Sequence, residues 1–126
     1  MPVQSINHIN IAVPQPLMQR VRDFYVEALG LEDRKRERGG MSGHWLYGGG
    51  EPLVHLMLPR EGAAQASQGS AAIDHFALTC TGLEAMKASL DRAGVPYRER
   101  VAADDGFVQL FVTDPAGIRV ELNFSV

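Results

Sequence analysis

The sequence predicts an α+β fold of two tandem modules, each a strand, a helix and three more strands, whose sheets together form a cup. Apolar residues recur at strand and helix spacing in this order twice along the chain, and glycine-rich turns separate the segments in both halves. His8 and His75, 67 residues apart, stand at matched points of the halves, and so do His55 and Glu121, 66 residues apart. This repeat indicates an internal duplication that places potential metal ligands at equivalent positions.

The first module is predicted over residues 5–58 and begins with a strand and a helix. Residues 5–13 alternate apolar with polar or small side chains, which is typical of a half-buried strand. Residues 17–29 follow two prolines and carry apolar side chains near helical spacing. Gly30 stands where such a helix is expected to end.

Three further strands complete the first module, because glycines interrupt the sequence twice after the helix. They are predicted over residues 31–38, 44–47 and 53–58. Residues 59–72 are rich in Ala, Gln, Gly and Ser and show no strong period, so we expect them to be a linker.

The second module is predicted over residues 73–126 and repeats the same order. Its helix is expected over residues 83–93, closed by Gly94. Its strands are predicted over residues 73–80, 95–101, 107–113 and 118–124. The two modules are expected to form one domain over residues 1–126, because the chain is too short for two independent domains.

Composition limits the classes of partner. The 45% of hydrophobic residues support a real core, and the net charge of −3 gives no electrostatic reason to bind nucleic acid or an anionic membrane. No apolar run approaches the length of a membrane span. Cys80 is the only cysteine, so the fold must form without an internal disulfide. We expect a cytoplasmic protein that acts on a small molecule.

Strand alternation assigns the potential ligands to a face. The apolar neighbours of His8, His75 and Glu121 must meet the helices, so these three side chains are expected on the opposite, uncovered face. The strand around His55 is apolar on both sides, which leaves its direction open. Imidazole and carboxylate groups suit Fe(II), Mn(II), Ni(II), Co(II) or Zn(II) and do not distinguish among these metals.

Two local motifs add a resemblance to a known family. Phe24-Tyr25 precedes Leu29-Gly30-Leu31, and Asp114-Pro115-Ala116-Gly117 precedes Glu121. With the two modules, these motifs resemble the vicinal oxygen chelate superfamily over nearly the whole chain. That superfamily includes glyoxalase I, extradiol ring-cleaving dioxygenases, methylmalonyl-CoA epimerase, fosfomycin-resistance transferases and metal-free bleomycin-binding proteins. The resemblance implies a glyoxalase-like fold and leaves the reaction open.

The resemblance also implies roles for the repeated residues. His8, His75 and Glu121 fall at metal-ligand positions of the family and form a two-histidine, one-carboxylate set. His55 falls where glyoxalase I carries a glutamate ligand, so it is either a fourth ligand or an unligated acid–base histidine, as in ring-cleaving enzymes. The expected cofactor is a divalent metal ion, and the expected catalytic residues are Glu121 and His55.

Other residues are predicted to line the same pocket. Alternation places four of them in the cup with the ligands, and three aromatic residues are candidates to close it, although core or dimer contacts explain such aromatics equally well. The pocket candidates are Asn10, Gln109, Phe111, Asn123, Trp45, Tyr47 and Tyr97. His44 lies beside a turn and is expected at the surface. Exposed strand edges favour a homodimer, and the sequence does not show whether the site forms within one chain or across two.

Three functions fit this pattern. In the first, a metal holds two adjacent substrate oxygens while Glu121 or His55 moves a proton, as in an isomerase or lyase. In the second, Fe(II) supports extradiol-type dioxygenase chemistry with His55 as the acid–base. In the third, the chain is no enzyme and binds a drug or metabolite, as bleomycin-resistance proteins do.

Overall fold

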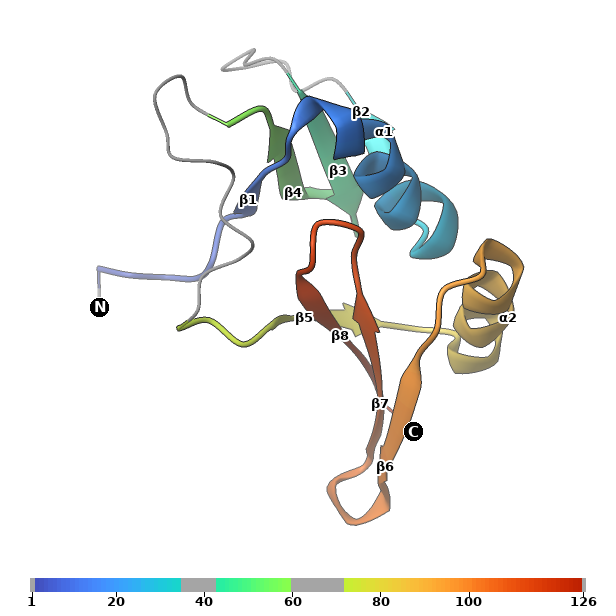
Figure 1. The fold of residues 1–126 in the computed structure, drawn as a ribbon. Coiled ribbons are helices and arrows are strands. Elements are labelled where there is room, and N and C mark those ends of the chain that lie inside the picture. The colour runs from blue at the N-terminus through green and yellow to red at the C-terminus, as the bar shows by residue number, and fades with distance from the viewer. Residues whose placement is uncertain (1, 35–42, 60–71, 126) are drawn as a thin grey trace.

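The computed structural model describes residues 2–34, 43–59 and 72–125, and it contains two four-stranded mixed sheets with two α-helices. The predicted α+β, two-module fold is therefore confirmed (Figure 1). The first half comprises β1 (Ile9–Ala12), α1 (Gln15–Asp23), the π-helix η1 (Phe24–Ala28), β2 (Glu32–Arg34), β3 (His44–Gly48) and β4 (Glu51–Met57). The second half comprises β5 (Phe76–Cys80), α2 (Leu83–Ala93), β6 (Arg98–Ala102), the 3₁₀-helix η2 (Ala103–Asp105), β7 (Phe107–Thr113) and β8 (Arg119–Ser125).

The two sheets have the same topology. Sheet A runs in the order β1-β4-β3-β2 and sheet B in the order β5-β8-β7-β6. In each sheet the first strand of the module pairs in parallel with the last, and the remaining pairs are antiparallel. The internal repeat seen in the sequence is thus a structural repeat, in which β1 corresponds to β5 and β4 to β8.

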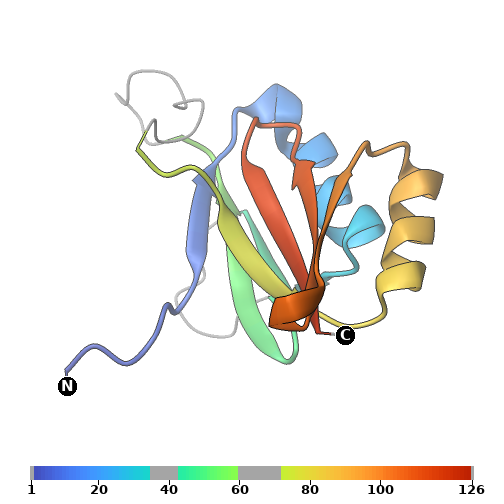
Figure 2. The same cartoon turned by 90° about the horizontal axis from the view of Figure 1, so that it is seen from below.

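Both helices lie on the same side of the molecule, and the sheets occupy the other side (Figures 1 and 2). One hydrophobic core joins the two modules: Val21 of α1, Leu46 of sheet A, Leu90 of α2 and Leu122 of sheet B are all fully buried in it. Each such side chain contributes roughly 1.5–3 kcal/mol by leaving water. Within the described residues, no helix has the length and hydrophobicity needed to cross a membrane.

The structure corrects several predicted boundaries. The single helix expected over residues 17–29 is two elements, because its last turn widens into η1, where the Leu29 amide donates to the Phe24 carbonyl at 3.1 Å. The strands β1 and β5 begin later than predicted, so His8 and His75 stand just before them. Residues 35–38 of the strand predicted over residues 31–38, and nearly all of the linker predicted over residues 59–72, lie outside the described residues.

A buried hydrogen bond ties the modules together. The Tyr25 hydroxyl in η1 donates to Asp114 Oδ2 at 2.6 Å, across 89 residues of sequence. Asp114 Oδ1 accepts from the amides of Ala116 and Ile118, which fixes the turn between β7 and β8. Ser89 Oγ of α2 adds a second link by donating to the Ala28 carbonyl at 2.7 Å. Motif residues from both halves therefore meet at the junction of the modules.

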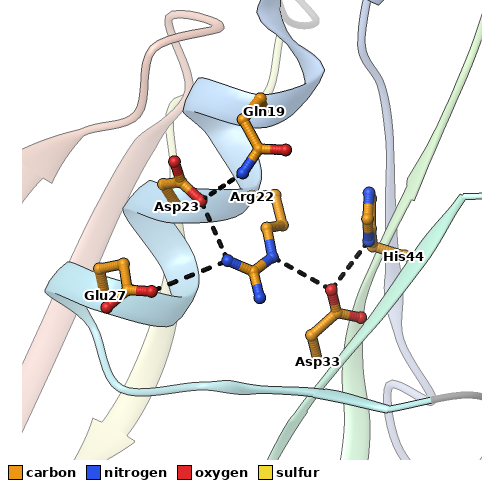
Figure 3. A network of polar contacts seen from close by, with 6 residues as sticks. All are labelled: Gln19, Arg22, Asp23, Glu27, Asp33 and His44. Carbon is orange, nitrogen blue, oxygen red and sulfur yellow. Dashed lines mark hydrogen bonds and ion pairs between the residues drawn. The ribbon is translucent and has the colours of Figure 1, made fainter.

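A polar network attaches α1 to the edge of sheet A (Figure 3). Arg22 donates through Nε to Asp33 Oδ2 at 3.1 Å and through Nη1 to Asp23 at 3.0 Å. Asp33 Oδ2 also lies 2.9 Å from His44 Nδ1. These contacts raise the pKa of Arg22 through hydrogen bonds to Asp23 and then Asp33. His44, which was expected at the surface, is thus partly buried and takes part in this structural network.

We expect Asp33→Ala to destabilise the protein by about 1 kcal/mol, because it removes the shared acceptor of a partly exposed network. Urea unfolding followed by far-UV circular dichroism measures the change. Arg20→Ala is the matched control, since this exposed arginine of α1 forms none of the ion pairs found among the described residues. An equal loss in both variants would contradict a specific role for the network.

Candidate functional site

Each sheet leaves one face uncovered by its helix, which we call its open face. On sheet A, the register pairs Asn10 with His55 and His55 with Trp45, so these three side chains form one row. The neighbours Val54 and Leu56 are fully buried on the helix side. Strand alternation therefore places His55 on the open face, which settles the direction that the sequence left open.

His55 is held tightly within this row. Its side chain is buried, and its ring stacks on Trp45 with centroids 3.8 Å apart and planes 5° apart. The Asn10 amide donates from Nδ2 to His55 Nδ1 at 3.1 Å and to Met57 Sδ at 2.8 Å. Because Nδ1 accepts this hydrogen bond, neutral His55 carries its proton on Nε2.

His8 approaches the same row from just before β1. Its ring meets Trp45 edge-on at 5.1 Å and lies 6.4 Å from His55, between ring centroids. Its Nδ1 donates to Asn7 Oδ1 at 2.8 Å. This hydrogen bond leaves the Nε2 lone pair available, as a metal-binding imidazole requires.

Sheet B presents the second pair of predicted ligands. The distance from His75 Nε2 to Glu121 Oε1 is 3.4 Å, and Glu121 is only 8% exposed. Asn123 donates from Nδ2 to Glu121 Oε2 at 3.2 Å. The pair thus joins an imidazole nitrogen and a carboxylate oxygen at the open face.

The carboxylate of Asp74 forms a hydrogen bond with the ring nitrogen of His75 that faces away from Glu121. His75 Nδ1 donates to Asp74 Oδ2 at 2.7 Å, and Arg119 Nη1 donates to the same oxygen at 2.9 Å. The hydrogen bond from His75, followed by the charge of Arg119, lowers the pKa of Asp74. An ionised Asp74 keeps the His75 proton on Nδ1 and directs the Nε2 lone pair toward Glu121, which is the usual support of a metal-binding histidine.

The four predicted ligands thus form two pairs, one on each sheet. His8 and His55 share the open face of sheet A, whereas His75 and Glu121 share that of sheet B. Within residues 2–34, 43–59 and 72–125, no three His, Cys, Asp or Glu side chains gather as a metal site would require. In the described part of one chain, the four predicted ligands therefore lie as two separate pairs, which we call half-sites of the predicted metal centre.

The predicted pocket residues divide between the half-sites. Trp45 and Asn10 contact His55, while Phe111 and Gln109 pair in register with Glu121 and Asn123 on the open face of sheet B. Tyr47 lies under the guanidinium of Arg34, 5.0 Å from ring centre to Cζ. Tyr97 packs against the hydrophobic core instead of facing the pocket. The physical reason is its register: it lies two residues before Glu99, which faces Lys87 of α2.

Sequence reasoning missed the residues that orient the histidines. Asn7 and Asp74 each directly precede a candidate ligand, and each accepts a hydrogen bond from that histidine's Nδ1. The same 67-residue offset that matches His8 with His75 also matches Asn7 with Asp74. Comparison of the two halves one residue further toward the N-terminus would therefore have identified both hydrogen-bond partners.

Comparison with known families assigns the chain. Residues 5–122 match the family described as the Glyoxalase/Bleomycin resistance protein/Dioxygenase superfamily. This protein belongs to that superfamily. The superfamily contains enzymes as well as binding proteins that bind small molecules, and its members typically hold a divalent metal. A search of curated proteins finds no significant match.

Solved structures confirm the glyoxalase-like fold. A protein of Bacillus anthracis assigned to the glyoxalase family is 22% identical, with 98% of this chain and 97% of that chain covered and a TM-score of 0.75. The fosfomycin resistance protein FosX of Listeria monocytogenes is 15% identical, with coverage of 98% and 95% and a TM-score of 0.71. TnmS3, an antibiotic-binding protein of Streptomyces sp. CB03234, is 20% identical, with coverage of 100% and 99% and a TM-score of 0.68.

Proposed function

We propose that this superfamily member is a divalent-metal-dependent enzyme in which His8, His75 and Glu121 hold the metal and the substrate binds through two neighbouring oxygens. The reaction is a proton transfer of the isomerase or lyase type. The observation that carries the proposal is the 3.4 Å approach of His75 Nε2 to Glu121 Oε1, with Asp74 fixing the histidine from behind.

The donor set fits a metal by its chemistry. Two ligands of one ion lie about 3 Å apart when each is about 2.1 Å from it, which is near the separation of His75 and Glu121. His8 offers the same kind of donor, since its Nδ1 proton is engaged by Asn7. Nitrogen and carboxylate donors suit Fe, Mn, Ni, Co or Zn. When bound, the metal supplies a Lewis acid that stabilises negative charge on a substrate oxygen.

We assign the proton transfer to His55 and Glu121. The Asn10 amide occupies His55 Nδ1, so neutral His55 carries its proton on Nε2, which offers a hydrogen bond to a substrate oxygen and does not coordinate a metal in this tautomer. Stacking on Trp45 and burial keep the ring in place. This environment favours the acid–base role over the fourth-ligand role that the sequence left open. Glu121 is the second proton-transfer group, because a carboxylate beside the substrate oxygens can accept a proton.

The proposed site forms between two copies of the chain. His8 and His55 come from one copy, and His75 and Glu121 come from the other, because one chain brings together only two half-sites among its described residues. Ile6 and Ile73, which flank the half-sites, are 82% and 70% exposed. A second copy in a homodimer can bury these two side chains when the half-sites meet.

An Fe(II) extradiol-type dioxygenase is a second candidate, favoured by the two-histidine, one-carboxylate composition of the ligand set. Binding without catalysis, of the bleomycin-resistance type, is the third, favoured by the partly exposed ring of Phe111 on the open face of sheet B, which suits a planar drug or metabolite. Oxygen uptake with a catechol and iron supports the dioxygenase. Activity with Ni(II) or Zn(II) and no oxygen uptake supports the isomerase or lyase.

Metal analysis of the wild-type protein tests the proposal. After purification under metal-replete, anaerobic conditions, we expect the protein to carry close to one divalent ion per chain. Elemental analysis beside a protein-concentration assay measures the ratio. Absence of metal under these conditions would overturn both metal-dependent functions and leave binding without catalysis as the remaining candidate.

A further inference from the structure

The open face of sheet B carries more positive charge than a chain of net charge −3 would suggest. The strand β6 lies at the edge of sheet B (Figure 1). Its first three residues are Arg98, Glu99 and Arg100. Glu99 faces the helix side, where Lys87 donates to it at 2.9 Å. Alternation therefore sends Arg98 and Arg100 to the open face, and both are exposed.

The register brings these arginines toward the half-site of Glu121. Arg98 pairs with Phe111, which pairs with Glu121 on the next strand. The guanidinium carbon of Arg98 lies 5.2 Å from the centre of the Phe111 ring. The Arg119 guanidinium lies 5.6 Å from the same ring centre, and the His75 ring meets it edge-on at 6.2 Å. The ring of Phe111 is thus surrounded by two guanidinium groups and by His75 of the half-site.

The arginines differ in how their charge is balanced. Arg119 pairs with Asp74 at 2.9 Å. Arg100 donates only to a neutral acceptor, Gln109 Oε1, at 2.7 Å. In the part of the chain that the structure describes, the ion pairs found involve neither Arg98 nor Arg100. Among the residues that the structure describes, these two guanidinium groups of sheet B therefore form no ion pair with a carboxylate.

We propose that Arg98 and Arg100 form an anion subsite and that the substrate is an organic molecule bearing an oxyanion, either a carboxylate or a phosphonate-type group. Guanidinium groups recognise such oxyanions through paired N–H donors. The body of the substrate then lies over Phe111, with its reacting oxygens toward His75 and Glu121. This inference rests on the proposed function, because it assigns the substrate class of the same site.

Binding of small anions to the metal-free protein tests the subsite without any need for activity. The protein is treated with a chelator and titrated with phenylphosphonate, benzoate or benzamide by calorimetry. We expect both anions to bind more tightly than neutral benzamide, and the tighter of the two identifies the oxyanion. In Arg98→Gln/Arg100→Gln the affinity for the preferred anion should fall by about tenfold or more.

Arg92→Gln in α2 is the matched control, because it removes an exposed arginine from the helix side and should leave anion binding unchanged. Arg98→Lys should bind with intermediate affinity, since lysine keeps the charge and loses the planar fork. The subsite is overturned if the double variant binds as wild type, or if benzamide binds as well as the anions. Metal content is measured on each preparation before the chelator is added, so a protein purified without metal but with arginine-dependent anion binding refutes the proposed enzyme and retains the subsite.

Discussion

Glu121→Gln is expected to abolish stoichiometric metal while leaving the fold intact. The amide keeps the shape of the side chain and removes the negative charge, so metal affinity should fall by more than about 100-fold. Glu121 points to the open face, away from the core, and the free energy of unfolding of the metal-free protein should change by less than about 1 kcal/mol. Elemental analysis and thermal unfolding of the chelated protein measure the two quantities.

His44→Ala serves as the control for this substitution. It removes a histidine that forms a hydrogen bond with Asp33 on the helix side of sheet A. Because His44 is not one of the proposed ligands, the variant should keep wild-type metal content. Retention of stoichiometric metal by Glu121→Gln would contradict the assignment of this carboxylate. Loss of metal from both variants would point to damage of the fold, which the unfolding measurement detects.

A mixture of two variants locates the site between chains. His8→Ala and Glu121→Gln should each lack metal as homodimers. If the half-sites of different chains combine, a heterodimer of the two variants has both defects in one site and keeps the other site intact. Refolding the variants together and isolating the heterodimer through two different tags should therefore recover one metal ion per dimer. A heterodimer without metal would show that each site forms within one chain.

The fold was predictable because hydrophobic period and turn residues agree in both halves. The predicted helix over residues 83–93 and strand over residues 107–113 coincide with α2 and β7. The prediction was less accurate where tertiary packing decides. The turn that becomes η1 buries Phe24, Tyr25 and Ala28 together, and no local pattern distinguishes such a π-turn from an ordinary helix end.

The site was predictable in its ligand candidates and less so in its surroundings. Alternation placed Glu121 on the open face, but the direction of His55 needed the register with Trp45. Tyr97 could not be assigned from the sequence, because an aromatic residue suits a core as well as a pocket. Arg98 was overlooked because its importance depends on facing Phe111 across the sheet, and strand pairing is a long-range feature.

Tyr25→Phe is expected to destabilise the protein by about 1–3 kcal/mol, because it removes the hydrogen-bond donor to the carboxylate of Asp114, which is only 3% exposed. Urea unfolding measures the loss. Tyr97→Phe is the matched control: its ring packs against the core, and among the hydrogen bonds found in the described residues its hydroxyl takes no part, so the change should stay within about 0.5 kcal/mol. Equal stability of Tyr25→Phe and Tyr97→Phe would contradict the role of the hydrogen bond between modules.

The ionisation of Asp114 gives this junction a pH dependence. Burial is the largest cause that raises the pKa of Asp114 above its ordinary value of 3.8. Because the pKa is higher in the folded state, the contribution of this carboxyl to stability is complete below 3.8 and declines as the pH rises through the folded-state pKa. Asp114→Asn does not titrate. The free energy of unfolding of wild type minus that of Asp114→Asn should therefore be larger near pH 4 than near pH 7, since all other groups titrate alike in both proteins. A difference that shrinks on acidification would mean that the hydrogen bonds from Tyr25 and the turn amides outweigh burial and hold the carboxylate ionised.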